Sequence, residues 1–162
     1  MNILRPMTVA DLPAIDTVQR ASFLPELWED MALFKDILAH FDQSSFVAEK
    51  DHSLMGYLLT HPTYIKRNDF EYGCQNLDGS EDYIYIHDLC VCPKARGMGV
   101  ARLLLEHLYI FARDNGFLKL CAIAVQGAER FWLRQNFVKV KPYSYNGTSG
   151  NGTPGTLMVR EI

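Results

Sequence analysis

The chain contains 162 residues, of which 48% are hydrophobic and 22% charged, and its formal net charge is -3. This composition excludes a disordered chain, and the scattered lysines and arginines form no basic face that would bind nucleic acid. No run approaches the roughly 18 apolar residues of a membrane span, and the N-terminus lacks the apolar stretch of a secretion signal. We therefore expect one domain over residues 1–162, located in the cytoplasm, that binds neither nucleic acid nor a membrane.

The cysteines and most of the histidines lack the spacing of metal ligands, so we expect no bound metal. Reduced, mostly buried thiols are the interpretation for Cys74, Cys90, Cys92 and Cys121. A surface or helix-face position is the interpretation for His40, His52, His61 and His107.

The N-terminal residues predict a strand at residues 2–6 followed by two helices. Thr8 and Asp11 have the spacing of a capping box, ahead of a helix whose apolar residues lie near one face: Leu12, Ile15, Val18 and Phe23. A second helix is indicated by apolar residues at helical spacing: Leu27, Met31, Phe34 and Leu38. Its start carries acids, which the helix dipole favours there: Glu26, Glu29 and Asp30.

Residues 45–49 and 54–59 predict an antiparallel hairpin around a turn at residues 50–53. A long polar segment follows at residues 61–82, and segments of this length shape a site or are mobile. Residues 83–91 then predict a strand, which leads through two glycines into an amphipathic helix that ends at Asn115 and Gly116.

That strand, glycine turn and helix predict a phosphate-binding cradle. The first N–H groups of a helix have no helical partner, glycines let a ligand approach them, and the helix dipole favours negative charge. Arg96 adds a cation beside them. The sequence therefore indicates a ligand with a pyrophosphate.

The remaining chain predicts a buried strand at 118–125, parallel to the strand at 83–91, and then a short helix at 128–135. Late strands are predicted at 137–141 and 156–160. The glycine-rich residues between them, 144–155, predict a flexible hairpin tip.

In this order the elements resemble the GNAT N-acetyltransferase superfamily over nearly the whole chain. One motif is similar to its acetyl-CoA motif Q/R-x-x-G-x-G/A and consists of Arg96, Gly97, Met98, Gly99, Val100 and Ala101. A second, at residues 128–137, is similar to its A-x-x-F-Y-x-x-x-G-F segment. Either motif alone is weak evidence, but both at the expected separation are strong evidence.

The resemblance implies an α+β fold with a mixed sheet of about seven strands, a splayed parallel pair and flanking helices. It implies acetyl-CoA as cosubstrate and no metal. The pantetheine arm is expected along the backbone of Leu89, Cys90 and Val91, with Trp132 beside the thiol. The pyrophosphate is expected on the N–H groups of residues 97–101, and the N–H of Val91 is expected to stabilise the oxyanion.

An amine must lose a proton before it attacks a thioester, so a general base is expected. His87 matches the position where family members carry a Glu or His base, and its alternative role is a structural hydrogen bond. Tyr85 lies on the same strand face and would form a polar wall or pack at the rim. Asp88 points to the opposite face unless a bulge reorients it, so it ranks second and is more simply a structural acceptor.

Trp132 occupies the place of the Tyr that often protonates the departing thiolate in this family, and an indole N–H is no usable acid. Water, Tyr143 or Tyr145 are the candidate replacements. Cys90 and Cys121 are candidate acyl carriers, but nothing in the sequence lowers their pKa, so direct transfer is simpler.

We therefore expect an N-acetyltransferase that moves acetyl from acetyl-CoA to a primary amine of a small molecule in a ternary complex. The alternatives are a protein lysine or N-terminal acetyltransferase and a non-catalytic acyl-CoA sensor. A homodimer is possible. Acids and aromatics near the expected entrance could serve a cationic acceptor, although a solvated acidic face is the commoner explanation: Glu26, Trp28, Glu29, Tyr64, Asp69 and Tyr72.

Overall fold

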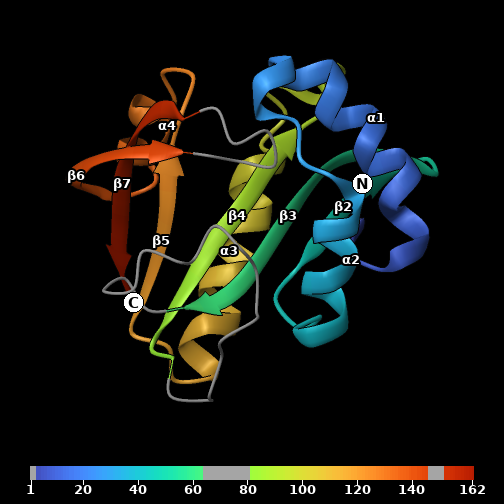
Figure 1. Ribbon diagram of the computed structural model, residues 1–162. Coiled ribbons are helices and arrows are strands. Elements are labelled where there is room, and N and C mark those ends of the chain that lie inside the picture. The colour runs from blue at the N-terminus through green and yellow to red at the C-terminus, as the bar shows by residue number, and fades with distance from the viewer. Residues whose placement is uncertain (1–2, 64–80, 146–151) are drawn as a thin grey trace.

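The computed structural model describes residues 3–63, 81–145 and 152–162 (Figure 1). Their seven strands form one sheet in the order β1-β2-β3-β4-β5-β7-β6. The strands are β1 (Ile3–Pro6), β2 (Phe46–Lys50), β3 (Ser53–Thr63), β4 (Tyr83–Val91), β5 (Lys119–Ala124), β6 (Val138–Tyr145) and β7 (Thr153–Glu161). β4 and β5 are parallel and every other neighbouring pair is antiparallel, which confirms the predicted mixed sheet.

The helices are α1 (Leu12–Ser22), α2 (Met31–His40), α3 (Val100–Asp114) and α4 (Glu129–Arg134). α3 covers one face of the sheet, and α1 and α2 cover the other (Figure 1). Two neighbours on β3 show the division, since successive strand residues point to opposite faces. Tyr57 meets Phe34 of α2 edge to face at 5.9 Å, while Gly56 lies under Val100 of α3.

The predicted capping box forms. The Asp11 carboxylate accepts from the N–H of Thr8 at 2.7 Å and from its hydroxyl at 3.0 Å, in a 3-10 turn (Val9–Asp11) that precedes α1. Arg5 on β1 donates both to Asp11 and to Glu49 on β2, with the shortest contact to each at 2.6 Å. This network therefore ties the start of α1 to the first two strands.

The second helix begins later than predicted. Leu27 belongs to a separate 3-10 turn (Pro25–Leu27), and α2 begins at Met31 because Asp30, with an extended backbone, caps it by accepting from Ala32 N at 2.8 Å. Glu29 lies between these two elements. It is only 4% exposed, so the expected solvated acidic face does not include it.

The hairpin of β2 and β3 is confirmed, with a turn at Asp51 and His52, both of which have positive φ. β3 extends to Thr63, further than predicted. The interior of the long polar segment, residues 64–80, lies outside the described residues, as do the candidates Tyr64, Asp69 and Tyr72. Most of the predicted hairpin tip, residues 146–151, lies outside them as well.

β4 carries a bulge at His87 and then separates from β5. Leu59 on β3 faces Asp88 and Thr60 faces Ile86, so His87 has no partner on β3. The parallel pairing of β4 with β5 ends at Ile86 and Ala122, whereas β4 continues to Val91. The two parallel strands therefore diverge beyond the bulge, as the resemblance implied.

Three predicted buried thiols are confirmed, since Cys90, Cys92 and Cys121 are buried and free, while Cys74 lies outside the described residues. The prediction of a surface position is wrong for His61, which is fully buried because β3 continues past it beside β4. Within residues 3–63, 81–145 and 152–162, no helix has both the length and the hydrophobicity needed to cross a membrane.

Gly56 fixes how closely α3 approaches the sheet. A Cβ at this position would lie 2.8 Å from the carbonyl oxygen of Cys90 and 2.9 Å from Val100 Cγ1. We expect Gly56→Ala to lower the free energy of unfolding by about 1–3 kcal/mol, because the Cys90 carbonyl belongs to the backbone of β4 and cannot move away from the added methyl group. Urea unfolding measures this, with Ser53→Ala at the exposed start of β3 as the control. An unchanged midpoint for Gly56→Ala would contradict the tight fit.

Candidate active site

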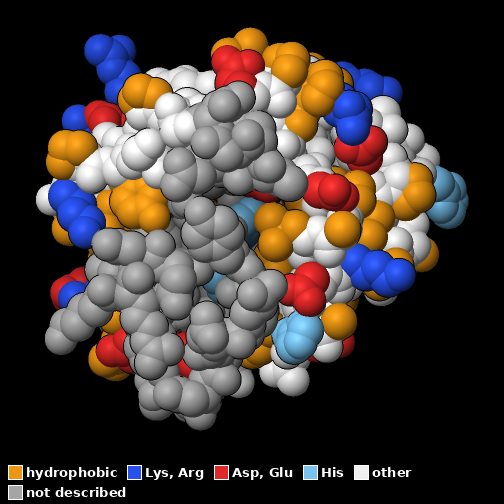
Figure 2. All heavy atoms as spheres, in the orientation of Figure 1, with side chains coloured by type: hydrophobic (Ala, Val, Ile, Leu, Met, Phe, Trp, Pro, Cys, Tyr) orange, Lys and Arg blue, Asp and Glu red, His pale blue; other side chains and the backbone are white. Residues whose placement is uncertain are grey.

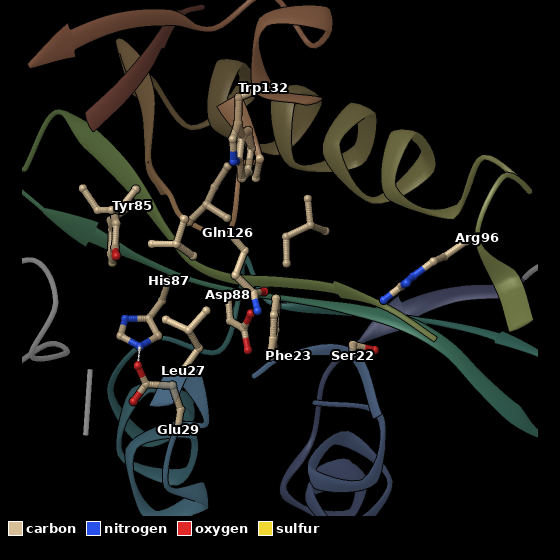
Figure 3. Close-up of a pocket in the computed structure, with 15 residues that line it drawn as sticks. Ser22, Phe23, Leu27, Glu29, Tyr85, His87, Asp88, Arg96, Gln126 and Trp132 are labelled. Carbon is tan, nitrogen blue, oxygen red and sulfur yellow. Dashed lines mark ion pairs between the residues drawn. The ribbon is translucent and has the colours of Figure 1, made fainter. Parts of the chain in front are cut away.

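A cavity of about 240 Å³ opens where β4 and β5 diverge (Figure 3). Its lining comes from the end of α1 and the following segment, from β4, from the turn before α3, and from β5 through α4. Lining residues include Ser22, Phe23, Leu27, Glu29, Tyr85, His87, Asp88, Leu89, Arg96, Val125, Gln126 and Trp132. Histidine side chains are visible in the hollow at the middle of this face in Figure 2.

The bulge places two neighbouring polar residues in this cavity. Strand alternation would send His87 and Asp88 to opposite faces, but the extra residue in β4 shifts the alternation by one. Both side chains therefore line the cavity. The condition attached to the Asp88 prediction, a bulge that reorients it, is met by the structure.

His87 lies at the centre of a buried polar cluster. Its Nε2 is 3.6 Å from Oε1 of Glu29, and the side chains are only 1% and 3% exposed respectively. The ring of Tyr85 meets the His87 ring edge to face at 5.5 Å, as expected for residues on one strand face. His61 on β3 lies 6.0 Å from the His87 ring, centroid to centroid. The cluster therefore combines side chains from β3, from β4 and from the segment that precedes α2.

Asp88 lies fully inside the protein, and its Oδ2 accepts a 2.7 Å hydrogen bond from the hydroxyl of Tyr57. Burial raises the pKa of Asp88 to about 7, although the Tyr57 hydrogen bond and the nearby His87 act in the opposite direction. Asp88 therefore changes charge near neutral pH, within the same cavity as His87.

A second hollow, of about 340 Å³, lies at the start of α3 and is lined by Arg96, Gly97, Gly99, Val100 and Ala101 among others. Gly97 and Gly99 both have φ of +78°, a conformation that glycine adopts readily. The N–H of Leu103 donates to the carbonyl of Gly99, so the N–H groups of Val100, Ala101 and Arg102 precede the helical ladder. The turn therefore has its glycines and unpaired N–H groups in the arrangement that the cradle prediction describes.

Met98 and Arg96, two residues of the motif, have different surroundings within this turn. The N–H of Met98 donates to Ala95 O at 3.2 Å, and its side chain is largely exposed outside the lining of the hollow. Arg96 lines both hollows, and Figure 3 shows its side chain extending toward the middle of the first. Arg96 therefore lies between the two spaces.

The backbone of β4 beyond the bulge faces the gap between the strands. The N–H of Cys92 donates to Met55 O at 2.8 Å. In antiparallel pairing every second residue bonds the partner strand, so the N–H groups of Leu89 and Val91 point away from β3. On that side β5 has already diverged. These groups are available to a ligand that lies in the gap like an extra strand.

Other predicted residues lie at the edges of the site. The Cys90 side chain points toward α1, with Sγ 3.9 Å from Val18 O, and burial raises its pKa to about 12. Burial also raises the pKa of Cys121, so neither thiol forms a thiolate readily. Trp132 is buried against Phe131 and Phe137 and lines the cavity. Tyr143 packs against the smaller apolar cluster that includes Tyr85, Ile123 and Leu157, and the Tyr145 side chain lies outside the described residues.

Sequence reasoning missed the inward position of Glu29, the buried His61 and the contribution of Gln19, which hydrogen-bonds Glu29 from α1. One local signal existed for Glu29, because Pro25 and Asp30 are typical of two separate helix starts and so interrupt the predicted helix. No local signal reveals His61 or Gln19, since their burial depends on distant parts of the chain.

The model of the acetyltransferase (GNAT) family matches residues 12–137, which is most of the chain. The chain belongs to the GNAT acetyltransferase family. Its fold and the family match together confirm the resemblance drawn from the two motifs. Comparison with curated protein sequences gives no significant match.

Three solved structures illustrate the range of proteins with this GNAT fold. The GphF GNAT-like decarboxylase in complex with isobutyryl-CoA has a TM-score of 0.82 at 14% identity, covering 98% of each chain. Ribosomal-protein-alanine N-acetyltransferase from Brucella melitensis has a TM-score of 0.72 at 21% identity, and the match covers 99% of each chain. An agmatine N-acetyltransferase has a TM-score of 0.72 at 16% identity, and the match again covers 99% of each chain. At these identities the likeness concerns the fold alone.

The raised pKa of Asp88 has a defined effect on stability. Unfolded Asp88 ionises at its ordinary pKa of 3.8 and folded Asp88 at about 7, so folding becomes less favourable as pH rises between these values. We expect Asp88→Asn to remove this loss. From pH 5 to pH 7.5, the free energy of unfolding of the variant should gain about 2 kcal/mol relative to the unsubstituted protein.

Urea unfolding at both pH values measures this difference. Comparison with the unsubstituted protein cancels the contribution of the other acids, such as Glu49, whose pKa is lowered by its hydrogen bond from Arg5. If the difference in free energy of unfolding between the two proteins stays constant with pH, the assignment of a buried Asp88 with a raised pKa is wrong.

Proposed function

We propose that this GNAT protein is an N-acetyltransferase that transfers acetyl from acetyl-CoA directly to a primary amine of a small molecule. The observation that carries the proposal is that one residue lines two neighbouring spaces. One cavity holds the bulge residues His87 and Asp88, and Arg96 in its lining also lines the hollow formed by the first turn of α3. A cosubstrate bound at both places would present its acyl end to His87.

The residues at the start of α3 fit a pyrophosphate. The left-handed Gly97 and Gly99 leave open space where a side chain would stand, and unpaired N–H groups of the first helical turn face it. Arg96 supplies a positive charge beside them. The N–H groups of Leu89 and Val91 would bond the pantetheine arm, and Trp132 would pack beside the thiol. When bound, acetyl-CoA supplies an acetyl thioester whose carbonyl carbon is the electrophile.

His87 would act as the general base. An amine enters largely as an ammonium ion, and one of the imidazole nitrogens would take its proton directly or through water. The N–H of Val91, which faces the gap, would stabilise negative charge that develops on the carbonyl oxygen. Asp88 and Tyr85 would shape the acceptor side of the cavity, where Asp88 also holds Tyr57.

The departing sulfur needs little help from the protein. Trp132 cannot donate a usable proton, and Tyr143 packs against the smaller apolar cluster rather than in the cavity lining. A thiol with a pKa near 8.5 leaves as a thiolate without a strong acid, and water can protonate it afterwards. The tryptophan is therefore compatible with transfer.

A small acceptor fits the size of the cavity. Its volume of about 240 Å³ suits a molecule of several heavy atoms together with an acetyl group, and its inner wall carries two carboxyl side chains, Glu29 and Asp88. This chemistry favours an acceptor that carries positive charge. The neighbour named agmatine N-acetyltransferase shows that a protein of this fold can act on such an amine.

Arg96→Ala tests the cosubstrate site. We expect the affinity for coenzyme A to fall about tenfold, because a charge-assisted contact to the pyrophosphate is lost. Isothermal titration calorimetry measures it. Arg113→Ala, an exposed arginine at the far end of α3, is the matched control and should change affinity less than twofold. If the unsubstituted protein does not bind coenzyme A, the proposed function is wrong.

His87→Gln tests the base. We expect the rate of coenzyme A release with an active amine to fall about 10²- to 10⁴-fold at neutral pH, and to recover partly at high pH, where more of the amine is already deprotonated. A panel of small amines, lysine peptides and N-terminal peptides identifies the acceptor. Equal rates for the variant and the unsubstituted protein would exclude His87 as the general base. Binding of acetyl-CoA without release above the hydrolysis background would indicate a sensor instead.

A further inference from the structure

We propose that Glu29 is the positioning residue of His87, and that Gln19 on α1 holds Glu29 in place for this purpose. The inference rests on the proposed role of His87 as the general base. It extends the site from β4 to the segment between α1 and α2, which the family motifs do not include.

Gln19 binds the backbone of Glu29 through both ends of its amide. Its Oε1 accepts from the N–H of Glu29 at 2.8 Å, and its Nε2 donates to the carbonyl of Glu29 at 3.0 Å. Gln19 itself is fully buried. A buried amide that satisfies both backbone groups of one residue fixes that residue much as a neighbouring strand would.

The residues on either side of Glu29 are also fixed. The indole N–H of Trp28 donates to Phe23 O at 3.0 Å, and Asp30 caps α2. Trp28 and Asp30 both have extended backbone angles, so the chain crosses this point as a short non-helical segment. These constraints turn the Glu29 carboxylate inward to His87, where Figure 3 shows it below the imidazole.

The geometry selects which imidazole nitrogen is basic. Nε2 is the nitrogen that faces Glu29, at 3.6 Å, and a carboxylate favours an N–H on the nitrogen beside it. Nδ1 is then the nitrogen with a free lone pair. Within the part of the chain that the structure describes, neither nitrogen has a hydrogen-bond partner, although both are buried. The 3.6 Å separation can shorten when the ring becomes charged.

The other groups that face His87 do not replace Glu29. Tyr85 and His61 present ring edges or tilted faces to it, and Asp88 is engaged with Tyr57. Arg96 lies further along the cavity, toward α3. Because a buried imidazolium requires a nearby negative charge, Glu29 is the group placed to stabilise His87 after it takes a proton.

Ring-nitrogen NMR of the full-length protein tests this inference without any substrate. The His87 signals are identified by their loss in His87→Gln, and the histidine rings are followed from pH 4.5 to 9. In Glu29→Gln we expect the preference for the Nε2–H tautomer to weaken, because the carboxylate beside Nε2 is removed. This variant keeps both Gln19 hydrogen bonds, because they involve only the Glu29 backbone.

The chain offers a matched control pair. His40 and Asp36 lie on the exposed surface of α2, with Nδ1 and Oδ1 3.4 Å apart. Asp36→Asn should leave the His87 tautomer signals unchanged. Gln19→Leu should weaken the Nε2–H preference of His87 as Glu29→Gln does, and the double variant should equal Glu29→Gln.

An unchanged tautomer preference of His87 in Glu29→Gln would overturn the proposal. Additive effects of Gln19→Leu and Glu29→Gln would overturn the part assigned to Gln19. These measurements use the free protein, so they can fail while coenzyme A binding and release succeed. In that case His87 would remain the base without Glu29 as its positioning residue.

Discussion

The site depends on one constraint in the sheet, the bulge at His87. It shifts the alternation of β4 so that His87 and Asp88 share one cavity, and it coincides with the last paired residues of β4 and β5. Without the extra residue, one of the two side chains would face α3. The N–H groups of Leu89 and Val91 would then point toward β3, and the N–H groups of the residues next to them would face the gap. A single unpaired residue therefore sets both the chemistry and the ligand-binding edge.

The parts of the fold that local chemistry determines could be predicted from the sequence. Thr8 and Asp11 form a capping box within four residues, and Gly97 and Gly99 satisfy the backbone of one turn, so their spacing was informative. The parallel pair also followed, because a helix between two strands requires a crossover. The predicted strand and helix boundaries differed by only a few residues except at the second helix.

The parts that depend on distant contacts could not be predicted. Pro25 and Asp30 mark a break in the helix beside Glu29, but the burial of Glu29 depends on Gln19, ten residues earlier, and His87, far along the chain. His61 is buried because β3 extends beside Tyr85, a pairing that no local pattern of β3 specifies. The bulge was considered only as a condition, since a strand of nine residues can pair with or without one.

The two halves of the site use different kinds of groups, which explains how the fold persists at 14% to 21% identity with its neighbours. The proposed cosubstrate half consists mainly of backbone N–H groups, which need only glycines and a strand edge and so tolerate most substitutions nearby. The proposed acceptor half consists of side chains, Glu29, His87 and Asp88, held by partners such as Gln19 and Tyr57. A change in one of these side chains alters chemistry without altering the sheet. In the proposed site, the segment between α1 and α2 and the bulge supply the side chains that would select the acceptor, whereas the start of α3 would bind the nucleotide.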